Sequence, residues 1–261
     1  MPILPDDTAL WWYLTAMSAA VIIIGLAKAG FGGGIGILAV PLIANALPAQ
    51  RALGVMLPIL IFADLFAIYH HRHHASKPHL RWTLSGALLG VALGTAVLWM
   101  FTESPAHLTT MLNLSVGTIC VGFVLIQGYR LLGGFIPHIP PGPGSGVVSG
   151  AVAGTVSTLA HSAGPVMSIY LLEQRMEKQL LVGTMVWFFF ILNITKLPTY
   201  LGLSFITSQT LIESALFFPL VPVGALLGLM MLKRLPQKPF TLILYAGAAL
   251  AGARMIYKGL F

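Results

Sequence analysis

The chain has 261 residues, of which 57% are hydrophobic and 8% are charged, whereas a soluble domain carries about 25% charged residues. Several apolar runs are as long as the ~20 residues that cross a bilayer core, which excludes a soluble globular domain. The formal net charge of +7 comes from basic residues in short loops, where they orient a membrane chain, so we expect no nucleic-acid partner.

Apolar stretches follow one another at residues 9–27, 35–47, 52–69, 82–101, 109–132, 146–160, 166–172, 180–201, 211–232 and 240–257. Two of the breaks between them stand out. A glycine cluster at residues 30–34 precedes the short stretch 35–47, and a polar run at residues 157–165 interrupts the later one. A helix over 35–47 would be about 20 Å long, too short for a ~30 Å hydrocarbon core. The sequence therefore predicts broken helices or hairpins at both places.

The distribution of lysine and arginine tests this arrangement. If each broken region enters and leaves on one face, the loops at 70–81, 130–144, 173–179 and 233–239 lie together and hold nine basic residues, against three on the other side. A single crossing at the second break would divide the basic residues evenly. We therefore expect the basic loops inside the cell and both termini outside.

The two halves of the chain also resemble each other. A shift of 129 residues places Leu53-Gly54 on Val182-Gly183 and Asp64 on Asn193. We predict an all-α integral membrane protein of two inverted repeats, each a broken-helix hairpin followed by three transmembrane helices, a common plan for secondary transporters. The first repeat covers residues 1–132, a Pro/Gly linker covers 133–144, and the second repeat covers 145–261.

Two motifs resemble the signatures of the TauE/SafE family of sulfite and organosulfonate permeases. The first is the glycine-rich segment from Gly25 to Pro41, and the second is His161-Ser-Ala-Gly-Pro165 with the Ser-Ile-Tyr-Leu-Leu that follows. The segment from Gly183-Thr184 to Lys196 is similar as well. The resemblance implies a secondary carrier of small anions, such as sulfite or sulfonates, in the cytoplasmic membrane. The second signature lacks a Gly-Gly-Gly run, so a symmetric pair of glycine nests does not follow.

The first candidate site residues are Gly32, Gly33 and Gly34, whose backbone N–H groups could face an anion at the start of a short helix. Close helix packing through small residues is the alternative. Lys28 lies just before this cluster inside an apolar stretch. A buried cation there indicates a substrate site, although a lysine near a helix end can also snorkel to the interface.

In the second half, Asn193 and Lys196 share one helical face at i, i+3. The Asn193 amide needs a partner if it is buried. Lys196 is expected either to bind substrate or to snorkel. Asp64 either pairs with a lysine or titrates as a proton-coupling group, and pairing is favoured.

The second break supplies the remaining candidates. His161 is expected to bind an oxyanion or transfer a proton, or, as a neutral ring, to bond a free backbone carbonyl. Ser157, Thr158 and Ser162 offer hydroxyl donors for oxyanion oxygens, although hydroxyls also satisfy helix backbones in membranes. Gly164 completes the predicted substrate-binding set.

The run of histidines and Arg72 at residues 70–74 is favoured as a basic interfacial anchor over a metal site, because it has no carboxylate or cysteine partner nearby. We expect no metal and no other cofactor. The leading hypothesis is an ion-gradient-driven transporter of a small oxyanion. An anion channel and a membrane-embedded enzyme using His161 and Asp64 stay open as alternatives, as do the transported anion, the coupling ion and assembly into a homo-oligomer.

Overall fold

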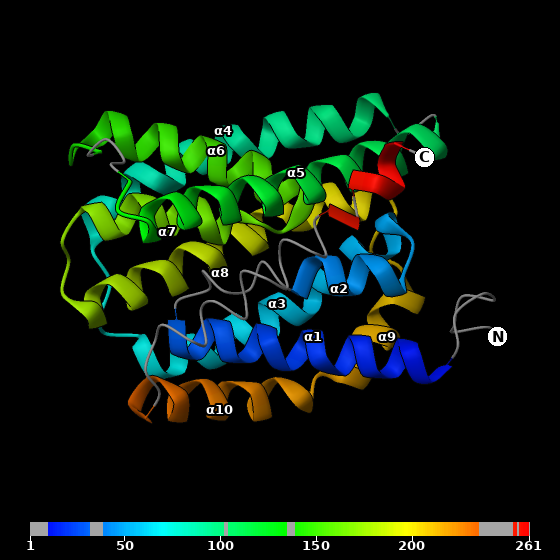
Figure 1. The fold of residues 1–261 in the computed structure, drawn as a ribbon, viewed down its shortest axis with the longest axis horizontal. Coiled ribbons are helices and arrows are strands. Elements are labelled where there is room, and N and C mark those ends of the chain that lie inside the picture. The colour runs from blue at the N-terminus through cyan, green and yellow to red at the C-terminus, as the bar shows by residue number, and fades with distance from the viewer. Residues whose placement is uncertain are drawn as a thin grey trace.

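The computed structural model describes residues 10–31, 39–101, 104–134, 139–234, 253–254 and 256–260, and these residues form helices joined by short connections (Figure 1). The first half contains α1 (Leu10–Phe31), α2 (Ala39–Ala46), α3 (Ala49–His71), α4 (Lys77–Met100) and α5 (Pro105–Leu131). The second half contains α6 (Pro143–Ala160), α7 (Ala163–Glu173), α8 (Lys178–Gly202), α9 (Ser208–Phe217) and α10 (Leu220–Arg234). No strand occurs within these ranges.

The described helices have the length and surface of membrane spans. Helices α1, α3, α4, α5 and α8 are each long and apolar enough to cross a bilayer, and the bent pair α9–α10 adds a sixth span if it is counted as one. Large apolar side chains such as Leu88, Leu93 and Leu226 are exposed on the outside of the bundle, where lipid tails rather than water can solvate them. The chain is therefore a multi-pass helical membrane protein.

One predicted stretch is divided in the structure. The apolar run 211–232 was expected to be a single span, but α9 ends at Phe217 and α10 begins at Leu220 after a bend of 45°. Pro219 lies at the bend. Proline lacks an N–H donor, and its ring clashes with the carbonyl four residues earlier, which favours a kink or break at this position. Most of the predicted stretch 240–257 lies outside the described residues.

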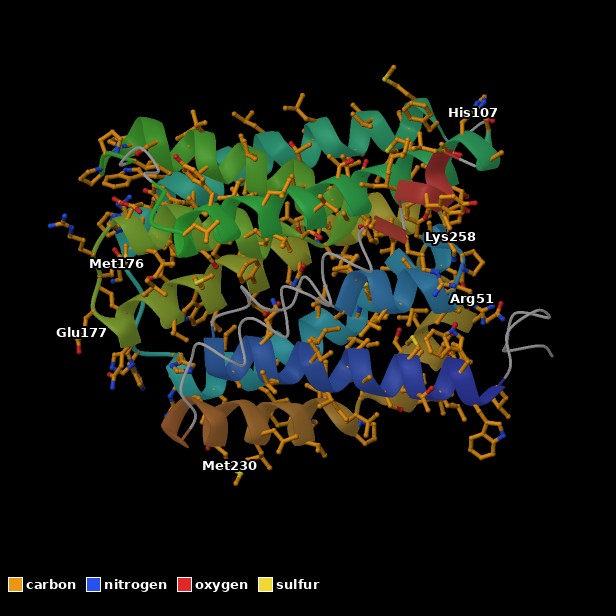
Figure 2. All side chains as sticks on the ribbon, viewed as in Figure 1. Arg51, His107, Met176, Glu177, Met230 and Lys258 are labelled. Carbon is orange, nitrogen blue, oxygen red and sulfur yellow. The ribbon has the colours of Figure 1, made fainter. Side chains whose placement is uncertain are left out.

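The helix connections sort into two ends of the bundle (Figures 1 and 2). The α3–α4 and α7–α8 loops, the start of α6 and the end of α10 lie at the end marked by Glu177. The start of α1, the α4–α5 connection and the segment 256–260 lie at the end marked by His107. The described parts of the basic loops grouped by the sequence therefore share the Glu177 end, and α6 and α7 form a hairpin that enters and leaves there.

Two helix pairs are packed so closely that glycine is required at their contacts. In the pair α4·α6, a Cβ atom added at Gly90 or Gly154 would overlap the backbone of Ala151 or Ala87. In the pair α1·α10, a Cβ atom at Gly224 would overlap the Ile22 carbonyl. Small residues let helix backbones approach in this way. Each pair joins a helix of the first half to a helix of the second.

Candidate functional site

The site is built around the break between α6 and α7. Helix α6 ends at Ala160, and the following residue, His161, adopts the left-handed conformation with φ 49° and ψ 24°. This conformation ends a helix by turning the chain away from the helical path. Helix α7 begins at Ala163, and Pro165 lies in its first turn, where its missing N–H removes no helical hydrogen bond. The break therefore follows from the local sequence.

Side chains from the surroundings donate to the carbonyl groups in the last turn of α6, including that of Ser157, which also accepts from the His161 N–H group at 2.9 Å. Lys196 Nζ donates to the Ser157 carbonyl at 3.3 Å, and Tyr200 Oη donates to the Thr158 carbonyl at 2.8 Å. Ser162 Oγ donates to the Ala160 carbonyl at 2.8 Å. Unpaired carbonyl groups are costly where no water can reach them, so these contacts hold the broken end of α6 in the protein interior.

Lys196 lies at the centre of this arrangement. Its side chain is fully buried, and its Nζ lies 2.9 Å from Ser157 Oγ and 3.0 Å from His161 Nδ1. The interfacial alternative for Lys196 is therefore wrong, because its ammonium group turns into the protein and not toward the end of α8. The other ring nitrogen of His161, Nε2, lies 3.1 Å from the Leu53 carbonyl. A carbonyl can only accept, so Nε2 carries a proton and Nδ1 accepts from the ammonium group of Lys196.

Three further predicted residues, Lys28, Asp64 and Asn193, form a buried ion pair with an amide hydrogen-bonded to it. Lys28 Nζ lies 2.6 Å from Asp64 Oδ1, and Asn193 Nδ2 donates to Asp64 Oδ2 at 2.7 Å. Lys28 also lies over the Phe189 ring, 4.3 Å from its centroid, in a cation–π contact. The pairing favoured for Asp64 by the sequence is thus present, and Asn193 has the partner that a buried amide requires.

The charges of the site do not balance. Lys28 and Asp64 neutralise each other, but no carboxylate in the described part of the chain lies within ion-pair distance of Lys196. A buried charge without an ion partner is costly. The polar partners of Lys196 are neutral oxygens and a neutral imidazole. A protonated Lys196 would therefore give the interior one positive charge more than the adjacent protein groups compensate.

The beginning of α7 adds hydrogen-bond donors at the same break. Its N-cap residue, Ser162, makes no side-chain cap bond. Within the described residues, the backbone N–H groups of Ala163 and Gly164 have no acceptor in hydrogen-bond range. The N-terminal end of a helix carries a partial positive charge and attracts anions. The break thus combines free backbone donors with the uncompensated ammonium group of Lys196.

Some of the predicted site residues contact one another through their side chains, whereas others form hydrogen bonds to backbone carbonyl groups. Six of them form two groups of three: Lys28, Asp64 and Asn193 in one, and Lys196, Ser157 and His161 in the other. The hydroxyl group of Thr158 donates to the Gly154 carbonyl and that of Ser162 to the Ala160 carbonyl. Gly164 is buried in the first turn of α7. Gly32, Gly33 and Gly34 lie outside the described residues.

The sequence analysis missed Tyr200 and a second cluster of buried polar residues around Glu213. Tyr200 belongs to the site, and its position four residues after Lys196 on the same helix face is a signal that could have found it. A second cluster lies near the His107 end, where buried Glu213 accepts from Tyr13 Oη and, at 2.9 Å, from Arg51 Nε. An acidic residue inside an apolar run was the available sign of this cluster.

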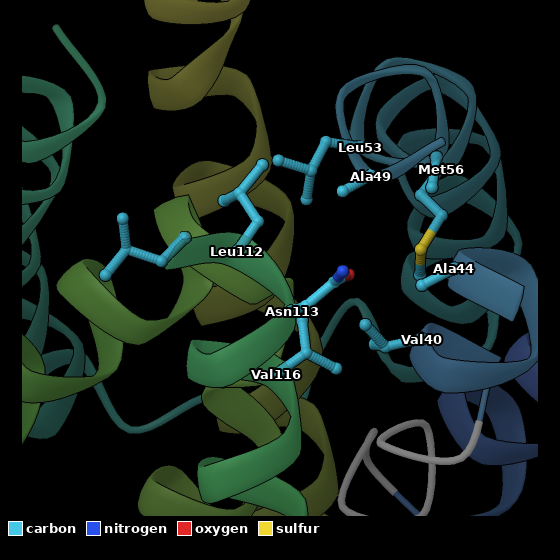
Figure 3. Close-up of a pocket in the computed structure, with 10 residues that line it drawn as sticks. Val40, Ala44, Ala49, Leu53, Met56, Leu112, Asn113 and Val116 are labelled. Carbon is cyan, nitrogen blue, oxygen red and sulfur yellow. The ribbon is translucent and has the colours of Figure 1, made fainter. Parts of the chain in front are cut away.

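A small pocket adjoins the site on the side of α2 and α5 (Figure 3). Its lining is apolar except for Asn113, whose amide points into the space between α5 and α2. Leu53, which lines the pocket, also supplies the carbonyl that binds His161. The pocket and the break therefore share Leu53 of α3 as a neighbour.

The histidine run at residues 70–74 makes local contacts. His71 Nε2 lies 3.4 Å from the Ala29 carbonyl, and Arg72 Nε donates to His73 Nε2 at 3.0 Å. Among the described residues, no group of three or more histidine, cysteine or acidic side chains is placed to hold a metal ion. The position of the histidine run at the Glu177 end is consistent with the basic interfacial anchor that the sequence favours.

Charged residues inside a membrane bundle mark the paths of substrates and ions in transporters and pumps, so the fold and the site define a multi-pass membrane protein with a polar, transporter-like interior. The sequence matches the sulfite exporter TauE/SafE family over residues 17–255, and the chain belongs to this family of membrane transporters. Comparisons with curated proteins and with solved structures gave no match.

Proposed function

We propose that this protein is a secondary transporter that carries a small sulfur oxyanion, sulfite or a short sulfonate, across the cytoplasmic membrane and is driven by an ion gradient. The observation that carries the proposal is the buried side chain of Lys196, which has no carboxylate partner within the described residues and contacts His161, two residues before the start of α7. Such a site favours binding of an anion.

The charge balance supports a substrate site in the second half of the chain. The Lys28–Asp64 pair is already neutral, so it attracts an anion weakly, whereas Lys196 gains a counter-charge when an anion binds. An oxyanion offers several acceptor oxygens. It can therefore accept from the Lys196 ammonium group, from Ser157 Oγ and from the backbone at Ala163 at the same time.

We further propose that the two halves are inverted repeats, as the sequence predicts. Gly54 and Gly183 are equivalent under the shift of 129, and each packs against the backbone just beyond the other's helix, at Phe205 and His74. The equivalent positions of Asp64 and Asn193 bond to each other. The two glycine-packed pairs are equivalent too, because α1 corresponds to α6 and α10 corresponds to α4. These contacts support a pseudo-twofold relation between the halves.

The pocket beside Asn113 is the proposed route to the site from the outside. It lies toward the start of α3, at the end of the bundle that is expected outside the cell from the distribution of basic loops. The Leu53 backbone separates it from His161. A small shift of α3 against α6 would connect the two.

Uptake of radiolabelled sulfite into proteoliposomes tests the function directly. We expect saturable uptake that drives counterflow of sulfite against its own gradient, which a channel cannot do. A variant Lys196→Met is expected to lose binding roughly 100-fold or more, because truncating one side of a buried charge contact has effects of that size.

The matched control is Lys258→Met, which removes the same charge from an exposed position and should transport normally. Binding is measured separately by the thermal shift that sulfite, thiosulfate, sulfoacetate and taurine give the purified protein. Equal loss in the two variants, or normal sulfite affinity in folded Lys196→Met, would contradict the assignment of the site.

A further inference from the structure

We propose that His161 is the proton-coupling residue of the transporter and takes up one proton for each oxyanion dianion that binds beside Lys196. This inference rests on the proposed function and adds to it the coupling ion, the residue that carries it and the order of events. The geometry of one imidazole ring and its two partners carries the argument.

In the empty site, the ring can hold only one proton. Its Nε2–H is bonded to the Leu53 carbonyl at 3.1 Å, so a second proton has to bind at Nδ1. That nitrogen faces the Lys196 ammonium group at 3.0 Å and already accepts a hydrogen bond from it. A proton on Nδ1 would remove this acceptor and place two positive groups in contact in the low-dielectric interior. The empty site therefore keeps His161 neutral.

A bound dianion reverses this situation. With one oxygen against Lys196 Nζ and another against His161 Nδ1, both nitrogen atoms donate to the anion and neither faces the other. A proton from the aqueous phase then forms the Nδ1–H bond, and the site holds two positive charges against the two negative charges of the dianion. Anion binding and proton binding favour each other through the same contact, as linkage requires.

The groups around the ring leave His161 as the residue that can change charge. On α8 it faces Lys196 and Tyr200, and Tyr200 Oη donates to a backbone carbonyl while lying 3.5 Å from His161 Nε2. The more distant charges that act on the ring include Lys28 of α1. Both oxygens of Asp64 on α3 are bonded, one by Lys28 and the other by Asn193. The ion pair thus stays neutral while His161 gains its proton.

Calorimetry of sulfite binding in buffers of different ionisation enthalpy counts the protons taken up. At about pH 8.5, two units above the ordinary histidine pKa of ~6.5, sulfite is mainly the dianion. Its own protonation contributes equally to every variant. Wild-type protein is expected to take up about one proton more per sulfite than His161→Gln, which keeps an amide donor for the Leu53 carbonyl.

Tyr200→Phe is the matched control, because it alters a neighbour of the ring and retains His161. It is expected to keep the wild-type proton count. Equal proton counts in wild type and His161→Gln would overturn the inference but would not contradict the proposed function of sulfite transport. Failure of wild-type protein to bind sulfite at all would instead overturn the proposed function, and the inference with it.

A spectroscopic measurement on wild-type protein keeps the test decisive if His161→Gln does not fold. In protein labelled with ¹⁵N at histidine, a sulfite-dependent imidazolium signal is expected at about pH 8.5, where exposed histidines are neutral. If all the histidine rings remain neutral in sulfite-saturated protein, the inference is wrong.

Discussion

Asn193 donates a hydrogen bond to Asp64 at 2.7 Å although the two residues are 129 positions apart in the sequence. The bond joins α3 to α8 in the middle of the bundle and fixes one oxygen of the carboxylate. Lys28 binds the other oxygen at 2.6 Å. This one carboxylate therefore ties together α1, α3 and α8, and the first prediction concerns its removal.

Replacing Asp64 by leucine is expected to destabilise the protein strongly. The variant leaves the ammonium group of Lys28 buried without its counter-charge, and breaking a buried ion pair in this way costs about 3–5 kcal/mol of unfolding free energy. Thermal unfolding in detergent measures the change. The double variant Asp64→Leu with Lys28→Met removes both charges and should recover much of the loss. A double variant as unstable as the single one would contradict this account of the pair.

A methyl group at the α4·α6 contact is expected to disrupt the fold. In Gly90→Ala the new Cβ would overlap the Ala151 carbonyl, which belongs to the backbone and cannot move aside cheaply. Gly122→Ala is the control, since a Cβ there meets no atom within 4 Å, and alanine favours a helix by about 1 kcal/mol over glycine. Size-exclusion profiles of the two variants should show aggregated and monodisperse protein, respectively. Similar profiles would argue against the close pairing of these helices.

Cysteine labelling tests the orientation in the membrane. After the single native Cys120 is replaced by serine, cysteines placed at His74 and Glu177 are expected to react only with reagent that reaches the cytoplasm. Cysteines at His107 and Lys258 should react from outside, because they lie at the opposite end of the bundle (Figure 2). Labelling of His74 and Glu177 from opposite sides would exclude the hairpin arrangement of α6 and α7.

Filling the pocket beside Asn113 is expected to block transport without unfolding the protein. Ala44 lines this pocket (Figure 3), and the ring in Ala44→Phe would occupy it. Sulfite flux should fall roughly tenfold or more, a loss of about 1.4 kcal/mol or more, with little change in the unfolding temperature. Ala96→Phe places the same ring on an exposed face of α4 and should leave flux unchanged. Normal flux in Ala44→Phe would remove the pocket from the route.

Most helices could be predicted because the bilayer requires apolar runs of a minimum length, and the runs stand out in the sequence. The break before Ala163 was also visible, since His161, Ser162 and Pro165 interrupt an apolar stretch. The bend at Pro219 was missed. Proline favours a kink, but Pro58 and Pro198 lie inside α3 and α8 without ending them, so the residue type alone does not locate the break. The contact of Lys196 with Ser157 could not be predicted, because it depends on how far α8 is rotated toward α6, and packing in three dimensions fixes that rotation.

The ion pair was predicted as one of two alternatives for Asp64, and no local pattern could decide between them. Residue types show that a buried carboxylate needs a partner, but only the fold shows that Lys28 and Asn193 are both within reach. The same holds for the uncompensated charge on Lys196. A sequence gives the charges of a site, whereas their balance depends on distances.

The glycine-packed pairs α1·α10 and α4·α6 leave no space for sliding, so each pair has to move as a rigid block. Any motion that opens the interior must then separate these blocks from α3 and α8. The Lys28–Asp64 and Lys196–Ser157 contacts cross those boundaries. Pulling them apart without a replacement partner would strand charges in a water-free interior. The bundle therefore resists opening while it is empty, which would protect the membrane against a leak of ions between transport cycles.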